Sequence, residues 1–563
     1  METNKRSKYI RLSIIVLINI IIFGVTNLVF DLKYEQVDDF IIYNLYSGLD
    51  GTYNIHGIYM HPVLCMVIGS FFRLISSINW HTIFLLTAQF ICFTTIGYLL
   101  LKKHQNKTMI ILYAIFASVF YTALLLLIQY TSVAALLILT AFFIIVHTIE
   151  ENKNKWQYIL LYIVLYSLGI MLRMQSLLII LPFLAIYGID HLIKLIKKQI
   201  EEKQFVKIVK AYAILLILTI VIYISNYCFY TNNINKEYLE YNNLRSTLHD
   251  LSSINYETHK PIYDEIGWSE NDFYLFYTFD FGDENVYSKE NLQKIIDYKI
   301  STNQYWNFNL DTQKVITSFI EETTNTNATI VIAFITIGII SIITNKDKRK
   351  LNIIIMATTI CIHLLFIIIN RSMLRVVIPE YILGTLLLIN NFAKVTENQK
   401  EKINYAILII PIILMISAAN DYEYNYNLKS YSNYKEIINY TNEHKENVYL
   451  YTTPSLQYRY LAYSVYEMPP QESFSNLRVL GGWDMFTENY YDFKARNNLE
   501  GTFLDLLKEN VYLINGNTNW SGINYNNYIN RIVLFLEENY NIQTTYEKIE
   551  EFGNLYIYKL RQQ

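Results

Sequence analysis

The sequence predicts an α-helical polytopic membrane protein that carries a small α/β domain at its C-terminal end. Of its 563 residues, 53% are hydrophobic and 17% are charged, and the mean hydropathy is +0.20. The apolar residues gather in blocks of about 18 to 22, the length that an α-helix needs to cross a bilayer. A formal net charge of −3 indicates no basic surface, so we expect no nucleic-acid partner.

The apolar blocks predict eleven membrane spans. A further block, 62–79, is also apolar, but counting it as a span would place the lysine-containing loops 102–107 and 150–155 outside, against the positive-inside rule. We therefore expect 62–79 to lie flat on the outer surface, with the Arg73 side chain reaching toward water. The predicted spans are 9–30, 80–101, 108–128, 131–149, 156–172, 174–190, 211–230, 328–344, 351–369, 376–392 and 403–420.

Loop charge predicts the orientation of these spans. The loops assigned to the inner side hold roughly 22 Lys and Arg, whereas the short outer turns hold few. The N-terminus is therefore expected in the cytoplasm and the C-terminus outside a plasma membrane, which we expect to be bacterial. The first apolar block lacks a small-x-small cleavage site, so we interpret it as a retained span.

A long polar region, 231–327, interrupts the spans and falls outside the membrane in this topology. It is rich in Tyr, Asn and Asp, and Ser288–Ile300 has the pattern of an amphipathic helix. A connection of this length usually carries a function or folds independently. Its mixture of aromatic and acidic residues suits sugar binding, and it equally suits a loop that covers a membrane surface.

The second polar region, 421–563, predicts the extracytoplasmic α/β domain, following a membrane module at 1–420. Strand-type and helical patterns alternate in it. Within it, the turn Leu480-Gly481-Gly482-Trp483-Asp484 presents an indole, either to an acceptor or as a structural turn. The strand patterns lie at Asn447–Thr453, Asn510–Ile514 and Asn554–Lys559, and the helical patterns at 502–509 and 525–541.

An adjacent carboxylate pair, Asp38 and Asp39, stands about eight residues beyond the first predicted span, within the outer loop 31–79. Carboxylates this close to hydrocarbon are costly unless they serve a site or face water, and within a pair one member can have a raised pKa. Such a group could act as a general base. The alternative is that both are solvated residues at the start of the helical pattern FIIYNLY.

Three arginines fall in outer turns that otherwise lack lysine: Arg173 in MLRMQ, and Arg371 and Arg375 in NRSMLRVVIPE. A guanidinium gives permanent, bidentate recognition of phosphate, so these residues are candidate ligands for a lipid-linked phosphate. The alternative partners are lipid head groups or the carboxylates of Asp38, Asp39 or Glu380.

Two histidines, His56 and His61, share the outer loop with the acidic pair. His61 precedes Pro62, where it can shape the start of the following helix and line a site, and packing or loop hydrogen bonding is the alternative for both. The histidines show no metal-ligand spacing, so the residues themselves predict no metal.

The acidic pair in the first outer loop, the His61-Pro62-Val63-Leu64 run, the flat helix after it and the terminal outer domain together resemble the GT-C superfamily of membrane glycosyltransferases. Protein O-mannosyltransferases and aminoarabinose transferases have an Asp-Glu pair and an H-P-P-L run at similar places. Here the second carboxylate is Asp39, and Val63 replaces the second proline.

This resemblance implies an enzyme that moves a sugar from a polyprenyl-phosphate carrier to an extracytoplasmic acceptor, such as a cell-envelope glycan, with inversion at the anomeric carbon. It implies a base at the acidic pair, with Asp38 favoured over Asp39, and arginine at the leaving phosphate. No cofactor follows from it with certainty, and a divalent cation at the acidic pair stays open.

Two other functions remain as alternatives. A polysaccharide polymerase or ligase with a pyrophosphate-linked donor would make 231–327 the centre of the chemistry. A flippase or transporter for a lipid-linked sugar would normally place charged residues near the bilayer midplane, where these spans have few.

Overall fold

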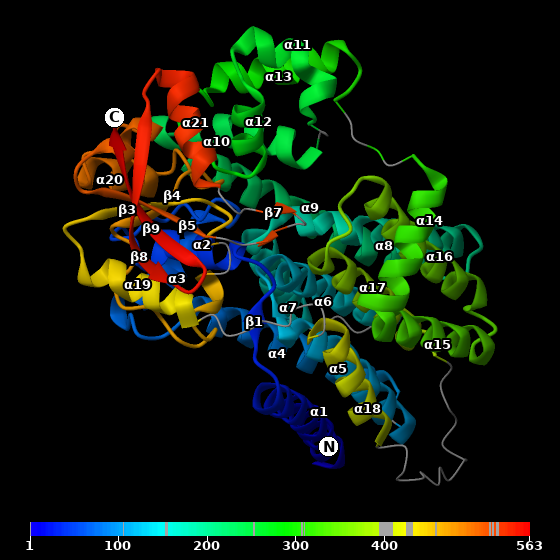
Figure 1. Ribbon diagram of the computed structural model, residues 1–563. Coiled ribbons are helices and arrows are strands. Elements are labelled where there is room, and N and C mark those ends of the chain that lie inside the picture. Colours follow the sequence, from blue (N-terminus) through cyan, green and yellow to red (C-terminus); the bar gives the residue numbers. More distant parts are fainter. Residues whose placement is uncertain are drawn as a thin grey trace.

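The computed structural model describes residues 2–104, 106–151, 156–251, 254–305, 308, 310–392, 409–423, 432–456, 459–516, 519–520, 523–524 and 528–563. Most of the chain is helical, and a β-sheet domain lies at one end of the helices (Figure 1). The apolar helices are α1 (Glu2–Val29), α4 (Trp80–Lys103), α5 (Lys107–Leu126), α6 (Tyr130–Glu150), α7 (Trp156–Leu172), α8 (Leu177–Ile196), α9 (Glu202–Phe229), α15 (Ala328–Thr344), α16 (Arg349–Ile368), α17 (Leu374–Asn390) and α18 (Ile409–Glu423).

A helix overlaps each predicted span, but not all of these helices have the length and composition of a membrane span. Within the described ranges, six are long and apolar enough to cross a bilayer, or seven if the bent pair 312–326 and 328–344 counts as one. Helices α7 and α18 are apolar but shorter. The described part of the chain therefore has six to seven helices that could span a membrane. Residues 403–408 of the last predicted span lie outside the described residues.

Polar residues fasten several helices together at one end. The Glu150 carboxylate at the end of α6 accepts hydrogen bonds from Lys103 at the end of α4 and from Lys348 before α16, both at 2.6 Å. Asn390 at the end of α17 donates to the same carboxylate at 2.9 Å. These contacts, the Glu150 cluster, join loops that the sequence assigns to a single side of the membrane.

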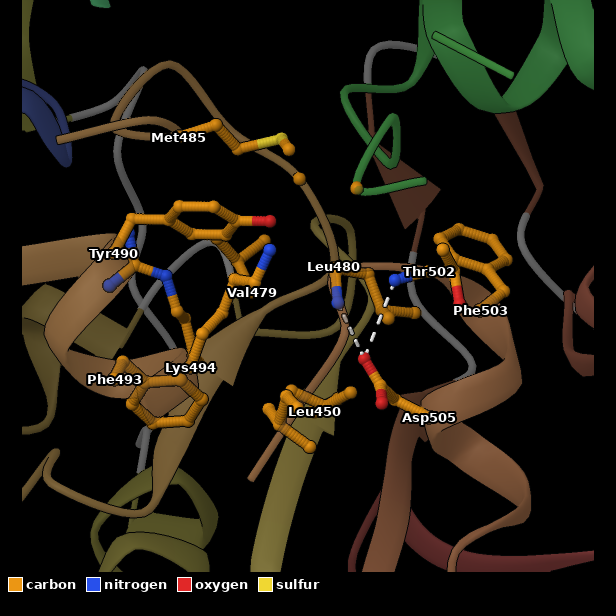
Figure 2. A pocket seen from close by; sticks show the side chains of 15 residues that line it. Leu450, Val479, Leu480, Met485, Tyr490, Phe493, Lys494, Thr502, Phe503 and Asp505 are labelled. Atoms are coloured by element: carbon orange, nitrogen blue, oxygen red, sulfur yellow. Dashed lines mark hydrogen bonds between the residues drawn. The ribbon is translucent and has the colours of Figure 1, made fainter. Parts of the chain in front are cut away.

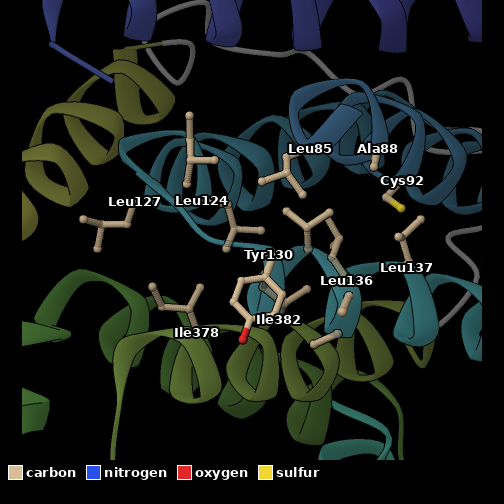
Figure 3. Close-up of a cluster of buried hydrophobic side chains, with 14 of the residues drawn as sticks. Leu85, Ala88, Cys92, Leu124, Leu127, Tyr130, Leu136, Leu137, Ile378 and Ile382 are labelled. Carbon is tan, nitrogen blue, oxygen red and sulfur yellow. The ribbon is translucent and has the colours of Figure 1, made fainter. Parts of the chain in front are cut away.

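Helix α6 is the centre of the helical part, and 94% of its most apolar stretch is buried. Side chains from α4, α5 and α17 surround it in a continuous hydrophobic cluster (Figure 3). Burial on all sides explains why this segment is apolar around its whole circumference rather than along one stripe. Its first residue, Tyr130, marks the end of the bundle opposite the Glu150 cluster.

The block 62–79 forms helix α3 (Pro62–Leu74), whose 13 residues are too few to span a bilayer. Pro62 occupies the first helical turn, where its missing N–H costs nothing, and the His61 side chain caps the helix by accepting from the backbone N–H of Val63 at 3.2 Å. One face carries exposed apolar residues, including Phe71 and Leu74. The Arg73 guanidinium lies over the ring of Tyr53.

The region 231–327 is folded and helical. Its helices are α10 (Asn233–Ser246), α11 (Tyr256–Ile266), α12 (Glu270–Tyr277), α13 (Lys289–Ser301) and α14 (Thr312–Glu321). Helix α13 coincides with the amphipathic pattern in the sequence, and its buried residues Leu292, Ile295 and Ile296 recur at helical spacing. These helices share a hydrophobic cluster with the C-terminal domain, so the two polar regions pack as a unit.

The C-terminal domain contains a mixed five-stranded sheet in the order β4-β3-β5-β9-β8. Strands β4, β3 and β5 are parallel, while β9 pairs antiparallel with β5 and β8. The sheet strands are β3 (Val448–Tyr451), β4 (Leu477–Val479), β5 (Val511–Gly516), β8 (Thr544–Phe552) and β9 (Leu555–Gln562), and the domain's helices are α19 (Ser432–Glu443), α20 (Glu488–Arg496) and α21 (Ile529–Tyr540).

Three of these strands fall on the predicted strand patterns. The predicted helix at 525–541 corresponds to α21, with 525–527 outside the described residues. The pattern at 502–509 forms a short 3₁₀ helix, Phe503–Leu507, rather than an α-helix. Two further short strands, β6 (Asn519–Trp520) and β7 (Ile523–Asn524), pair with each other.

Candidate functional site

The acidic loop is held against the start of α6 by a short parallel pairing. Strand β1 (Lys33–Tyr34) pairs with β2 (Leu127–Ile128), and the Glu35 N–H continues the ladder by donating to the Ile128 carbonyl at 3.0 Å. Helix α2 (Asp38–Ser47) starts directly afterwards. Two segments about ninety residues apart in sequence therefore meet at one end of the helical bundle.

Asp39 points into the protein and is completely buried. Its Oδ1 accepts from His81 Nε2 at 2.8 Å and from the Tyr130 backbone N–H at 3.0 Å. With Asp39 ionised, His81 carries its proton on Nε2 and its Nδ1 accepts from the Tyr46 hydroxyl at 2.5 Å. Burial raises the pKa of Asp39, and the hydrogen bond from His81 opposes that rise. This carboxylate connects α2, α4 and α6 and has no open face toward a substrate.

Asp38 points in another direction and keeps 20% of its side chain exposed. Its Oδ2 lies 3.2 Å from Arg375 Nη1, which also donates to the Gln36 side-chain carbonyl at 2.8 Å. Adjacent residues on a helix face different ways, so the two carboxylates have different surroundings. Asp38 is therefore the member of the pair that a substrate could reach.

Glu35 is a third carboxylate at this site, and the sequence reasoning missed it. Its side chain is buried, its Oε2 has no hydrogen-bond partner in the described part of the chain, and burial raises its pKa to about 7. The positive charge of Arg375 opposes the rise, and the charges of Asp38 and Asp39 add to it. Its position three residues before Asp38 is the feature of the sequence that could have revealed it.

Arg173 lies beside the same loop and has no carboxylate partner among the described residues. Its guanidinium donates to the Tyr130 hydroxyl and lies 4.4 Å from the centre of the Tyr59 ring, an arrangement in which the ring face attracts the cation. Trp483 packs against Tyr59, with 5.4 Å between the two ring centres. The predicted indole therefore contacts the acidic loop.

The glycines before Trp483 are structural. A Cβ on Gly481 would come 2.2 Å from the Phe279 carbonyl oxygen, and one on Gly282 would come 1.7 Å from the Leu480 carbonyl oxygen. The backbones of 279–282 and 480–482 approach too closely for larger residues, and the Gly482 N–H donates to Phe279 at 3.0 Å. The turn thus joins the polar region 231–327 to the terminal domain.

The third predicted arginine has a different partner. Arg371 Nη2 lies 3.7 Å from Oδ1 of Asp250, in the polar region 231–327, so it pairs with neither residue of the acidic pair. Glu380 is buried within α17 and forms no ion pair with any of the three predicted arginines. Of the partners considered for the three arginines, the structure shows a carboxylate for Arg375 and for Arg371.

Both loop histidines make structural hydrogen bonds. His61 caps α3 and its Nε2 lies 2.8 Å from the Ser225 hydroxyl on α9, and burial lowers its pKa. His56 contacts the Phe229 carbonyl at 3.1 Å and lies 3.5 Å from Glu488 of the terminal domain. Both residues therefore hold the acidic loop against α9.

No group of three or more His, Cys, Asp or Glu side chains in the described part of the chain is arranged to hold a metal ion. The candidate site consists of Asp38, Glu35, Arg173 and Arg375 at the end of the apolar helices, and the buried Asp39 holds it in place.

A comparison with protein-family models finds no family that matches this chain, and a comparison with curated protein sequences finds no matching protein.

Proposed function

We propose that the protein is a membrane glycosyltransferase of GT-C type, which moves a sugar from a polyprenyl-phosphate carrier to an acceptor outside the membrane, such as a cell-envelope glycan. One observation carries the proposal: a partly exposed carboxylate, Asp38, lies with Arg375 and near Arg173 where the apolar helices end. A lipid-linked phosphate would reach the protein at this depth.

In the proposed reaction, Asp38 accepts the proton of the acceptor hydroxyl as that oxygen attacks the anomeric carbon. The bond between the anomeric carbon and the phosphate oxygen breaks, its electron pair leaves with the polyprenyl phosphate, and the anomeric configuration inverts. Arg173 and Arg375 stabilise the negative charge that grows on the phosphate.

The pairing of Arg375 with Asp38 links donor binding to the base in the proposed reaction. A phosphate that binds Arg375 competes with the Asp38 carboxylate for the same guanidinium. Displacement of Arg375 would leave the Asp38 carboxylate free to accept a hydrogen bond from the acceptor hydroxyl. Donor binding and activation of the base are therefore coupled.

Asp39 is a positioning residue in this mechanism. It fixes His81 and the first N–H of α6, and Tyr130 in turn holds Arg173 through its hydroxyl. The buried carboxylate thereby sets the position of both α2 and the arginine without touching the substrate.

We further propose eleven spans, with the N-terminus inside and the C-terminus outside a bacterial plasma membrane. The Glu150 cluster supports this topology, because it collects the ends of α4, α6 and α17 and the start of α16 away from Asp38. The lysines of that cluster would then face the cytoplasm, as the positive-inside rule expects.

The test is transfer by the purified protein in detergent, with a radiolabelled sugar on either a polyprenyl monophosphate or a polyprenyl pyrophosphate. The proposal predicts transfer from the monophosphate donor and its loss in Arg173→Ala. Transfer from the pyrophosphate donor alone would favour a polymerase or ligase. Unchanged use of the monophosphate by Arg173→Ala would refute the arginine's role.

A further inference from the structure

A partly open cavity of about 40 Å³ lies between α2 and the sheet of the terminal domain. One water needs roughly 10–15 Å³ of such a cavity, so there is room for a few waters or for one small group of a ligand. Helix α2 contributes Ile41, Asn44 and Leu45, and the terminal domain contributes Arg459 and Arg478 among others.

The two arginines bring fixed positive charge into this interface, and each is only 8% exposed. Arg459 donates to the Leu456 carbonyl at 3.1 Å, and its guanidinium lies 5.4 Å from the ring centre of Phe40 and 5.2 Å from that of Tyr451. No carboxylate in the described part of the chain lies within ion-pair distance of Arg459. Buried arginine is normally paired, so this one lacks its expected partner.

The carboxylates of the cavity already have partners. Asp484 accepts from Arg478 at 2.8 Å, and Asp50 accepts from Asn489 at 2.7 Å and from the Thr52 N–H at 3.3 Å. In contrast, the Nε of Arg478 and the Oδ1 of Asn44 are buried without a hydrogen-bond partner among the described residues. The cavity therefore has one unpaired donor and one unpaired acceptor, beside a guanidinium that has no counter-ion among the described residues.

Arg478 also lines a second cavity of about 40 Å³, and Figure 2 shows other residues that line it, among them Lys494 and Asp505. Its charged groups have partners: Lys494 pairs with Glu284, and Asp505 accepts from the backbone N–H of Gly501 and Thr502. The unmet charge is thus confined to the cavity that α2 lines.

That cavity lies close to Asp38 along the helix. Ile41 and Leu45 follow Asp38 by three and seven residues, which places them on the same side of α2. At 1.5 Å per residue, they lie about 4.5 to 10 Å further along the helix axis. A single elongated substrate could therefore occupy the cavity and reach Asp38.

We propose that this cavity binds an oxyanion group, a carboxylate or phosphate ester, carried by the acceptor, so that the acceptor is an acidic glycan. The anion supplies the missing counter-charge of Arg459 and accepts from Arg478 Nε. Its assignment to the acceptor rests on the proposed transferase function, whereas the anion site itself does not.

Isothermal titration of the purified full-length protein with inorganic phosphate, with glucuronate and with glucose tests the anion site. We expect saturable binding of one or both anions and none of glucose. Arg459→Gln should weaken the binding about tenfold to a hundredfold, the usual size of a lost charge-assisted hydrogen bond. Arg459→Lys should retain part of the affinity, because it keeps the charge but not the planar fork. Arg561→Gln serves as the matched control, because the Arg561 side chain on β9 is 67% exposed and far less buried than that of Arg459.

Failure of this inference is distinguishable from failure of the proposed function. Binding that does not saturate, or that is equal in the wild type and a folded Arg459→Gln or Arg459→Lys variant, would overturn the anion site even if transfer occurs. Anion binding without any sugar transfer would refute the transferase instead. In a transferring protein, a preference for neutral over acidic acceptors would refute the assignment to the acceptor.

Discussion

The two neighbouring carboxylates should differ sharply in what they contribute to stability. Asp39→Ala removes the acceptor of two buried donors, His81 Nε2 at 2.8 Å and the Tyr130 N–H at 3.0 Å. Each buried donor left unpaired costs about 1–3 kcal/mol, so we expect a loss of roughly 3–5 kcal/mol, the range found when a buried pair is broken. Asp38→Ala removes a partly exposed ion pair with Arg375, for which about 0–1 kcal/mol is typical.

The assay is the temperature at which half of the purified protein loses its folded, monodisperse state in detergent, followed by size-exclusion chromatography after heating. Asp39→Ala should unfold at a clearly lower temperature than the wild type, and Asp38→Ala close to it. Asp297→Ala, which removes an exposed carboxylate on α13, is the control for loss of a charge. Equal destabilisation by the Asp38 and Asp39 changes would refute the division of roles within the pair.

Three other outcomes are expected, two from the structure and one from the loop charges of the sequence. Arg173→Ala should reduce transfer by about tenfold or more through loss of a charge-assisted phosphate contact, whereas Arg371→Ala, whose partner is Asp250, should reduce it less; the comparison is made in initial rates. Burial raises the Glu35 pKa to about 7, so the folded state holds its proton more tightly than the unfolded state, and stability should fall by about 3 kcal/mol as pH rises from about 4.5 to about 7. Glu35→Gln should abolish that decline in thermal unfolding at a series of pH values. Single cysteines should be protected from an impermeant reagent in intact cells at positions 105, 152 and 347 and labelled at positions 260 and 480.

Much of the helical architecture could be predicted because burial in an apolar environment leaves a long local signal. Blocks such as 131–149 are apolar throughout, and α6 is correspondingly buried on every side. The number of membrane spans is harder to predict, since short apolar helices such as α3 and α7 resemble spans in composition. For such helices, the length and the charge of the neighbouring loops decide whether a span is predicted.

The site could be predicted only in part, because its geometry depends on contacts between distant segments. The acidic pair is visible in sequence, but which member faces inward depends on His81 and on the first turn of α6. Glu35 is buried beside the pairing of β1 with β2, which joins segments far apart in the sequence. Arg459 gave no signal at all, since nothing near it in sequence reveals that its neighbours are aromatic rings.

The central claim is that Asp38 accepts the proton of the attacking hydroxyl, and the rate of sugar transfer by Asp38→Asn tests it most directly. Asparagine keeps the size of the side chain and removes the proton acceptor. Loss of a general base typically lowers the rate about a hundredfold to ten-thousandfold. We predict a fall of that size per molecule of folded protein, with donor binding retained. Transfer at a rate near that of the wild type would contradict the mechanism and remove this loop from the chemistry.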